Sequence, residues 1–387
     1  MNVEETLARL VAIDSVSARS NREIISYAAA RAEAAGMRLR TYPYMDERGV
    51  EKTNMVAVLG PSVRDEEVEL ALVGHTDTVP YDAGWTEALA LAARDGRLYG
   101  RGACDTKGFI AAAIKAIEGC EAARLRRSVA LVLTADEEIG CLGAKRLAEA
   151  RSLVAHYSIV GEPTSLQPIR AGKGYCLAEV TVRGREGHSA YPALGASAIF
   201  RAARLISQLE GIAEALKQES REEFDPPHTT LNVGVVAGGT AKNIIAGECR
   251  FTLEWRPVPG QKAARVLDLL RAAVEDESAR DETFDCEINV LRIDEGMETA
   301  GDSRLVRLLE EATGKTAGTI SFGTEAPEMQ RLGAEAVVLG PGDIRVAHRT
   351  GEFVPVAELQ QCVSILAHAI EHFCMAEINS DGQRLSG

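Results

Sequence analysis

Apolar and polar positions along the chain follow two patterns, and the first predicts an α/β domain. Apolar residues recur at helical spacing over residues 3–13 and 22–35, and Gly36 supplies a stop signal. Short strands such as VELALVGH, residues 68–75, are apolar almost throughout and alternate with further helices. Strands of this kind are buried on both faces, so the pattern predicts a largely parallel sheet between layers of helices. The remaining predicted strands are 37–44, 54–60, 128–135, 157–163 and 336–342, and the remaining helices are 106–117, 143–150, 303–313 and 356–373.

The second pattern lies between the early and late parts of that domain. Residues 176–183 alternate between apolar and polar positions, as a half-buried strand does. After this strand we expect a helix at 196–209, strands at 230–236 and 248–254, a helix at 261–274 and a strand at 286–291. This β-α-β-β-α-β order is that of the ferredoxin-like α+β unit. We therefore expect one domain at 1–174 and 293–387, interrupted by an inserted domain at 175–292.

Composition narrows the class of protein. With 387 residues the chain is too long for one small core, and its 46% hydrophobic and 26% charged residues argue against disorder. A net charge of −14 argues against a nucleic-acid-binding protein. The eight cysteines form no CxxC pair, the first residues lack a basic signal-peptide start, and no apolar stretch is long enough for a bilayer. We expect a cytoplasmic protein that contacts no membrane.

Three adjacent carboxylates, Asp136, Glu137 and Glu138, follow an apolar strand in the stretch LTADEEIG. Like charges at this spacing repel one another, so a solvated turn is the ordinary explanation. A bound cation is the alternative, because it would neutralise carboxylates at the end of a buried strand. Metal-binding side chains at other strand ends would favour the cation.

Such side chains do follow several of the predicted strands. His75 ends one strand, Glu162 and His348 follow two others, and Asp105 lies in the glycine-rich loop GRGACDTKG. In open α/β sheets, ligands bind beyond the carboxyl ends of the strands. Taken alone, Asp105 is as well explained as a helix N-cap, and each histidine as a surface residue.

Together these side chains predict a site for two metal ions. Two imidazoles and several carboxylates form the mixed nitrogen and oxygen set of zinc or a similar divalent ion. Five ligands are too many for one tetrahedral ion, but they suit two ions that share a carboxylate. One of the two neighbouring glutamates can then bind metal, while the other takes a proton from a water whose pKa the metals lower towards ~7. Asp77, two residues after His75, can accept the second ring N–H of that histidine.

The motifs also resemble those of a known family. GHTDTVP, GRGACDTKG, TADEEIG and GEPT stand in the order and spacing found in metal-dependent deacylases, which include succinyl-diaminopimelate desuccinylases, carboxypeptidase G-type enzymes, aminoacylases and acetylornithine deacetylases. The resemblance covers about residues 5–374. It implies an α/β catalytic domain with a mainly parallel mixed sheet, an inserted ferredoxin-like dimerisation domain, and a homodimer.

The resemblance also implies a role for each candidate in the metal site. The cofactors would be two divalent ions, Zn²⁺ or Co²⁺. One ion would be held by His75, Asp105 and Glu162, and the other by Asp105, Glu138 and His348, so that Asp105 bridges them.

Three further residues would act on the reaction. Asp77 would orient a metal-binding histidine, and Glu137 would be the general base and then the acid that protonates the leaving amine. His188, in the inserted domain, would reach the partner subunit's site and stabilise the tetrahedral oxyanion. One such donor typically lowers the barrier by ~3 kcal/mol. Without the resemblance, His188 reads as an exposed loop histidine.

Four residues would contact the substrate. Asn243 and Arg256 match family positions near it, and an arginine can grip an α-carboxylate through two parallel hydrogen bonds. The alternative for Arg256 is an ion pair at a strand end. Thr324 and Glu325, in GTEAP, would face the substrate, and Glu325 could pair with a cationic side chain such as that of ornithine.

Within the family, EPTSLQP, GTEAP and LGPGDIRVAH look most like the acetylornithine deacetylases. The implied reaction is hydrolysis of N-acetyl-L-ornithine to L-ornithine and acetate, a step of arginine biosynthesis. The alternatives are deacylation of acetylcitrulline, acetyl-lysine or succinyl-diaminopimelate, and dipeptide hydrolysis. A different class, a metal-free binding or scaffold protein, would have lost Glu137 or a ligand, and all of these are present.

Overall fold

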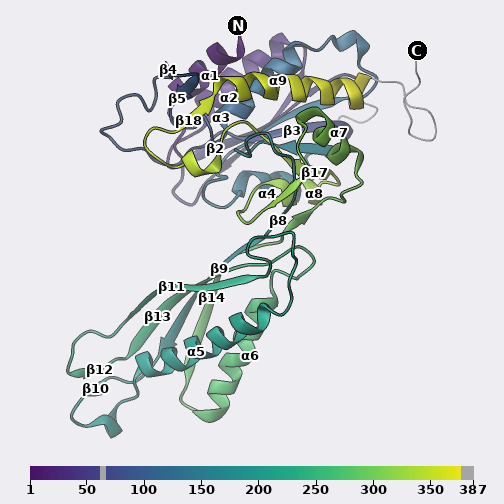
Figure 1. Cartoon of the computed structure of the whole chain (residues 1–387). Helices are drawn as coiled ribbons and strands as arrows, with labels where there is room; N and C mark the ends of the chain where they lie inside the picture. The colour runs from purple at the N-terminus through teal and green to yellow at the C-terminus, as the bar shows by residue number, and fades with distance from the viewer. Residues whose placement is uncertain (62–66, 376–387) are drawn as a thin grey trace. The chain divides into compact units, whose positions relative to one another are not determined.

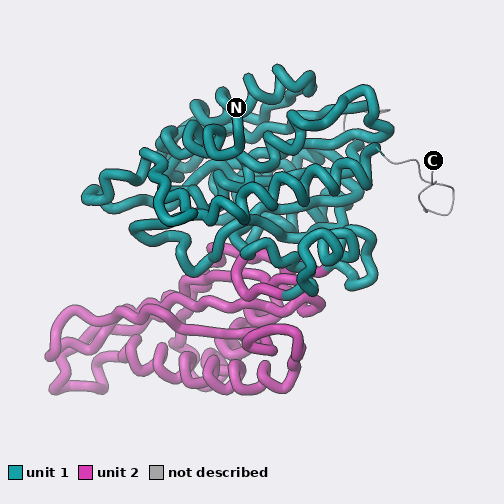
Figure 2. Tube along the Cα trace, turned by 45° about the horizontal axis from the view of Figure 1, so that its top comes forward, with its two compact units in different colours: residues 1–170, 299–318, 324–387 teal, residues 171–298, 319–323 magenta. Residues whose placement is uncertain are grey.

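The chain divides into two compact units, coloured separately in Figure 2. The computed structural model describes residues 1–61 and 67–375, so 62–66 and 376–387 of the predicted catalytic domain lie outside the described residues. Unit 1 comprises 1–170, 299–318 and 324–387, and unit 2 comprises 171–298 and 319–323. The short segment 319–323 groups with unit 2 although it lies beyond the predicted insertion.

Unit 1 is an α/β domain whose sheet is parallel at its centre (Figure 1). Its strand order is β1-β2-β6-β3-β7-β17-β8, with parallel pairing from β6 to β17 and antiparallel pairing on both sides. The fold class predicted for this domain is therefore confirmed. Its strands are β1 (Arg38–Met45), β2 (Glu51–Leu59), β3 (Glu67–His75), β4 (Ala92–Arg94), β5 (Arg97–Tyr99), β6 (Val129–Thr134), β7 (Val154–Val160), β17 (Glu335–Val338) and β18 (Phe353–Pro355). The chain passes between the units four times: within β8 (Ile169–Gly172), after residue 298, within β16 (Gly318–Ile320) and after residue 323.

The helices of unit 1 form its core with the sheet. They are α1 (Val3–Ala12), α2 (Arg22–Ala34), α3 (Lys107–Glu118), α4 (Leu142–Glu149), α7 (Arg304–Thr313), α8 (Ala326–Arg331) and α9 (Val356–Ile370). Helix α3 packs against α1, α2 and α9, and its apolar sequence FIAAAIKAI is buried on nearly every side, as expected for a helix without a polar face. Helices α4 and α8 pack against each other, α4 against β2 and α8 against β7.

Two local features of α1 show how the sequence specifies this layer. Asn2 and Glu5 form a reciprocal capping box at its start, which satisfies two backbone N–H groups that the helix leaves open. Leu7 and Leu10 point inward and are fully buried. Burial of each stabilises the fold by roughly 1.5–3 kcal/mol relative to exposure.

Unit 2 has the predicted ferredoxin-like topology. Its main elements are β9 (Tyr175–Arg183), α5 (Ala198–Leu216), β11 (Thr230–Gly238), β13 (Glu248–Arg256), α6 (Arg265–Arg280) and β14 (Asp285–Asp294). The four strands pair antiparallel in the order β11-β13-β9-β14, and the two helices cover one face over a core that includes Val180, Phe251 and Trp255. Its short strands are β10 (Gly187–His188), β12 (Ile244–Ile245) and β15 (Met297–Glu298).

Helix α6 begins at Arg265 and not at the predicted Gln261. The preceding residues form turns, and the backbone N–H of Ala263 donates to the carboxylate of Glu295. Glu295 is distant in the sequence, so a local pattern cannot reveal this contact, which pairs an N–H just before the helix. Among the described residues, no helix combines the length and apolarity that a membrane crossing requires.

Candidate metal centre

The carboxyl ends of the central strands of unit 1 lie at one edge of the sheet. His75 is the last residue of β3 and stands beside Thr134, the last residue of β6. Val160, at the end of β7, pairs with residues near the ends of both β3 and β17. The loops that follow these strands therefore start close together, as expected where an α/β sheet binds ligands.

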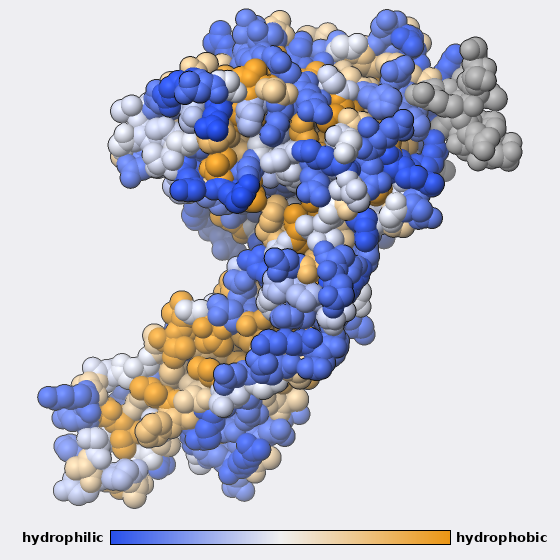
Figure 3. Space-filling model, in the orientation of Figure 1, coloured by the Kyte–Doolittle hydropathy of each residue, from blue (hydrophilic) through white to orange (hydrophobic). Residues whose placement is uncertain are grey.

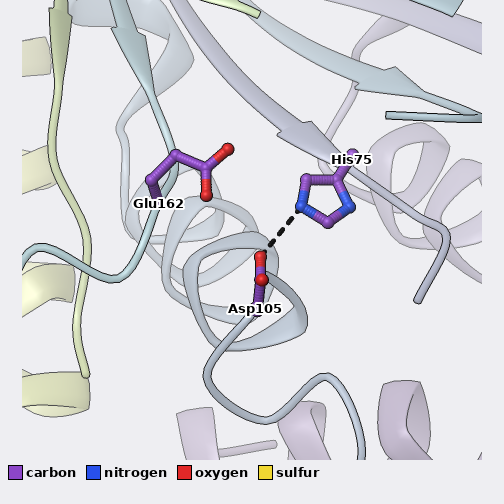
Figure 4. A group of neighbouring side chains, drawn as sticks. All are labelled: His75, Asp105 and Glu162. Atoms are coloured by element: carbon purple, nitrogen blue, oxygen red, sulfur yellow. Dashed lines mark hydrogen bonds and ion pairs between the residues drawn. The ribbon is translucent and has the colours of Figure 1, made fainter. Parts of the chain in front are cut away.

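The first predicted ligand group comes together at this edge. Figure 4 shows the side chains of His75, Asp105 and Glu162 directed at a common region. The Nε2 atom of His75 lies 3.0 Å from Oδ1 of Asp105, and one ligand atom from each residue lies within 4.8 Å of the others. All three side chains are buried.

The second predicted group shares Asp105 with the first. Nε2 of His348 lies 3.1 Å from Oδ2 of Asp105 and 3.0 Å from Oε2 of Glu138. Asp105 thus turns one oxygen to each imidazole, which fits a carboxylate bridging two ions. His348 adopts a left-handed backbone, with φ 58°, a conformation that is uncommon for residues other than glycine.

The electrostatics of the edge also fit bound cations. Burial, together with the charge of Asp105, raises the pKa of the Glu162 carboxyl well above its usual range. Burial raises the pKa of Glu137 to about 8, and the neighbouring Glu138 contributes. A divalent cation in each ligand group would offset this repulsion, so the residues present fit two metal ions.

The loop that carries Asp105 is held by a residue that the sequence did not single out. The backbone N–H groups of Cys104 and Asp105 both donate to Oε1 of Glu352, at 2.9 and 3.1 Å. Arg101 donates to the other oxygen of this buried carboxylate at 2.5 Å. Asp105 does not cap α3, because Thr106 occupies the N-cap position. The peptide bond between these two residues is cis.

Asp77 accepts the ring N–H of His75 through its backbone oxygen, and its carboxylate, the predicted acceptor, lies farther from the ring. Nδ1 of His75 lies 3.0 Å from the backbone oxygen of Asp77 and 3.6 Å from its Oδ1. The carboxylate accepts the backbone N–H groups of Glu137 and Glu138, at 3.1 and 3.3 Å, and the hydroxyl of Ser17 at 2.7 Å. Asp77 therefore contacts both the histidine and the glutamate pair.

Among the described residues, Glu137 belongs to neither ligand group, although its neighbour Glu138 belongs to one of them. Its Oε1 accepts the thiol of Cys141 at 3.3 Å. A half-buried carboxylate that lies beside a metal-binding set without belonging to it is placed to move a proton.

Thr324 and Glu325 are both buried in unit 1, at 7% and 1% exposure. Oε1 of Glu325 has no hydrogen-bond partner among the described residues. Burial, partly opposed by His75, raises the pKa of this carboxyl to about 7. A buried acid with an unsatisfied oxygen is suited to a polar or cationic ligand group.

The candidates in unit 2 lie at two ends of its sheet. His188 and Asn243 are exposed neighbours: β10 pairs with β12, and the N–H of Ser189 donates to the backbone oxygen of Asn243. Arg256 ends β13, where its Nη1 donates to the backbone oxygen of Ser321 at 3.0 Å. Its Nε donates to Glu254 at 2.9 Å, and its guanidinium lies 4.6 Å from the centre of the Tyr175 ring.

Comparison with known proteins finds close relatives. Residues 71–372 match the model of peptidase family M20/M25/M40. The chain is 57% identical over 371 residues to an acetylornithine deacetylase from Myxococcus xanthus, covering 95% of this chain and 97% of that protein. It is 35% identical over 385 residues to an acetylornithine deacetylase from Proteus mirabilis, covering 96% and 97%. A tripeptidase from Staphylococcus aureus shares the fold, with a TM-score of 0.75 at 23% identity over 96% of this chain and 97% of that one.

Proposed function

The chain belongs to peptidase family M20/M25/M40, a family of metal-dependent amide hydrolases, and from this premise we propose that it hydrolyses N-acetyl-L-ornithine to L-ornithine and acetate. The observation that carries the proposal is the 57% identity, over 95% of the chain, to an acetylornithine deacetylase. The corresponding pathway is arginine biosynthesis, and the proposed compartment is the cytoplasm.

Two divalent cations, Zn²⁺ or Co²⁺, are the proposed cofactors. His75, Asp105 and Glu162 would hold one, and Asp105, Glu138 and His348 the other, in the two groups described above. When bound, such ions polarise a carbonyl and acidify a water. The buried, mutually repelling carboxylates of this edge support the assignment.

Glu137 is the proposed proton carrier. Its carboxylate takes a proton from the attacking water and delivers it to the amine that leaves, as a general base and then a general acid. Asp77 supports both steps, because it contacts His75 and accepts the backbone N–H of Glu137. The Cys141 thiol, 3.3 Å from Oε1, orients the carboxylate further.

Substrate contacts are proposed for both units. Glu325 would pair with the cationic end of ornithine, and its unsatisfied buried oxygen supports this role. Thr324 stands beside it in the chain. In unit 2, Arg256 would bind the α-carboxylate, and the backbone oxygen and ring that it already contacts would hold its guanidinium in place.

His188 and Arg256 cannot contact one small substrate from the same chain. Strand β13 runs nine residues, Glu248 to Arg256, and spans about 27 Å. β10 and β12 lie beyond its Glu248 end, at the lower left of Figure 1. If both residues act on the substrate, they belong to different subunits. This supports the proposal that His188 and its neighbour Asn243 act on the partner's site.

The surface of unit 2 supports a homodimer. β11 is an edge strand with a neighbour on one side only among the described residues, and unpaired edges are normally covered. Figure 3 shows apolar side chains over β11 and towards β10 and β12. Phe200, at the start of α5, is 72% exposed, too apolar a side chain to face water in such a cluster. The other exposed members are Tyr191, Leu194, Val235, Val236 and Ile244.

A substrate panel tests the function. Purified protein loaded with Zn²⁺ or Co²⁺ would be assayed with N-acetyl-L-ornithine, acetylcitrulline, acetyl-lysine, succinyl-diaminopimelate and a dipeptide. We expect the highest kcat/KM for N-acetyl-L-ornithine. If another compound of the panel gave a higher kcat/KM, that compound would become the proposed substrate. If no amide were hydrolysed, the proposed function would be refuted.

A further inference from the structure

Asp136 is the one carboxylate of LTADEEIG that neither metal group nor the proton transfer uses. Its side chain is completely buried. Oδ1 lies 2.7 Å from Nζ of Lys52, which is 1% exposed, and Oδ2 accepts the hydroxyl of Tyr44 at 2.8 Å. Lys52 comes from β2, 84 residues earlier in the chain.

The ammonium of Lys52 makes a second contact that leads back to the site. Nζ donates to the backbone oxygen of Ser17 at 2.7 Å. The hydroxyl of Ser17 donates to Oδ2 of Asp77 at 2.7 Å, and Asp77 accepts the backbone N–H of Glu137 at 3.1 Å. Because Glu137 directly follows Asp136, these contacts form a closed ring around the start of the glutamate pair.

The backbone of Asp136, inside this ring, has an unfavourable conformation. Asp136 has φ 59°, in the left-handed region that residues other than glycine disfavour. This turn takes the chain out of β6 and sets the direction of Glu137. An aspartate whose Oδ1 is held by a buried ammonium can keep such a conformation, since the surroundings determine it.

We infer that Lys52 is a positioning residue for Glu137: by gripping Asp136 and Ser17 together, it fixes the turn from which the catalytic carboxylate projects. The inference rests on the proposed role of Glu137 in proton transfer. The competing explanation is that the Lys52–Asp136 pair only stabilises the fold.

Removal of both charges separates these explanations. Lys52→Met or Asp136→Asn alone leaves an uncompensated buried charge, so both should lower the Tm. The double variant buries no charge and should recover most of the Tm. Positioning predicts that the metal-loaded double variant still loses about 10- to 100-fold in kcat, because a displaced catalytic group is inefficient. KM should stay within about twofold and metal content should equal that of the wild type, since no ligand or substrate contact is removed.

Two variants that each remove one hydroxyl form a matched pair, and they disturb the buried core less than the removal of both charges does. Ser17→Ala opens the ring at its contact with Asp77, whereas Tyr44→Phe removes the Asp136 contact that lies outside the ring. We expect several-fold lower kcat at unchanged KM for Ser17→Ala and wild-type kcat for Tyr44→Phe.

The measurements are kcat, KM, Tm and bound metal by elemental analysis. The inference is overturned if the folded, metal-loaded double variant has wild-type kcat. It is also overturned if kcat falls only together with metal content, or if Ser17→Ala and Tyr44→Phe behave alike. A wild-type enzyme that hydrolyses no amide would instead refute the proposed function, so the two failures are distinguishable.

Discussion

At the scale of single residues, Glu137 and Glu138 are adjacent in the sequence but have different partners. Glu138 lies 3.0 Å from the ring nitrogen of His348, whereas Glu137 accepts a thiol from Cys141. Strand-end positions indicated where the ligands lie, and the family resemblance assigned Glu138, and not Glu137, to the set that the structure brings together. Lys52, Ser17 and Glu352 were missed because each contacts the site from a distant segment and carries no local signal.

Glu137→Gln should separate metal binding from proton transfer. We expect kcat to fall about 10²- to 10⁴-fold, because a general base and acid is lost. Metal content should be unchanged, since Glu137 belongs to neither ligand group. Steady-state kinetics and elemental analysis would check this, with the ligand variant Glu162→Gln as the contrast that loses metal. Loss of metal from Glu137→Gln would contradict the role.

Removal of metal should destabilise the protein. Without cations, the buried Glu162 and the half-buried Glu137 lie among other carboxylates, and desolvation together with these charges raises their pKa. Bound ligand stabilises the folded state by about 4 kcal/mol at a thousandfold excess over Kd. Calorimetry before and after chelation should therefore show a lower Tm, and added Zn²⁺ should restore it. An unchanged Tm would argue against a buried metal site.

At the scale of elements, long apolar strands and helices were predictable, and very short ones were not. β4, β5 and β18 have three residues each, too few to show a periodicity, and form their own small sheet. The helices join through contacts that periodicity does not encode. One is the bridge from Arg31 of α2 to Glu118 of α3, with Nε and Oε1 2.7 Å apart.

This bridge should make stability depend on pH. Partial burial raises the pKa of Glu118, but its hydrogen bonds with Lys115 and with Arg31 outweigh burial and lower the pKa below the ordinary 4.5. A depressed carboxyl pKa stabilises the fold above the unfolded value, and that stability is lost as pH falls through the folded pKa. Glu118→Gln should cost up to about 1 kcal/mol at pH 7. Urea titrations should show the difference shrinking below pH 4.5; a difference independent of pH would contradict this.

At the scale of the whole molecule, the two-unit division followed from the change of pattern along the sequence. The sequence pattern did not predict that residues 319–323 belong to unit 2, because this depends on contacts such as those of Ser321 with Arg256 and Asp225. The separation of His188 from Arg256 along β13 likewise depends on strand register. That separation supports the proposed division of one site between two chains.

Mixing of two inactive variants tests the shared site. His188→Ala lacks the donor and Glu137→Gln lacks the base, but a mixed dimer contains one site with both residues intact. Random exchange of subunits should therefore restore about a quarter of wild-type activity. The measurement is turnover after co-refolding, with each variant alone as the control. No recovery, despite mixed dimers seen by mass spectrometry, would place both residues at the same chain's site.

The distance along β13 has a consequence for gene dosage. If His188 acts on the partner's site as proposed, a chain that carries both lesions, Glu137→Gln and His188→Ala, would give its wild-type partner no oxyanion donor and would have no base of its own. Every mixed pair would be inert, so such an allele would be dominant, although each lesion alone would leave half of a mixed pair working.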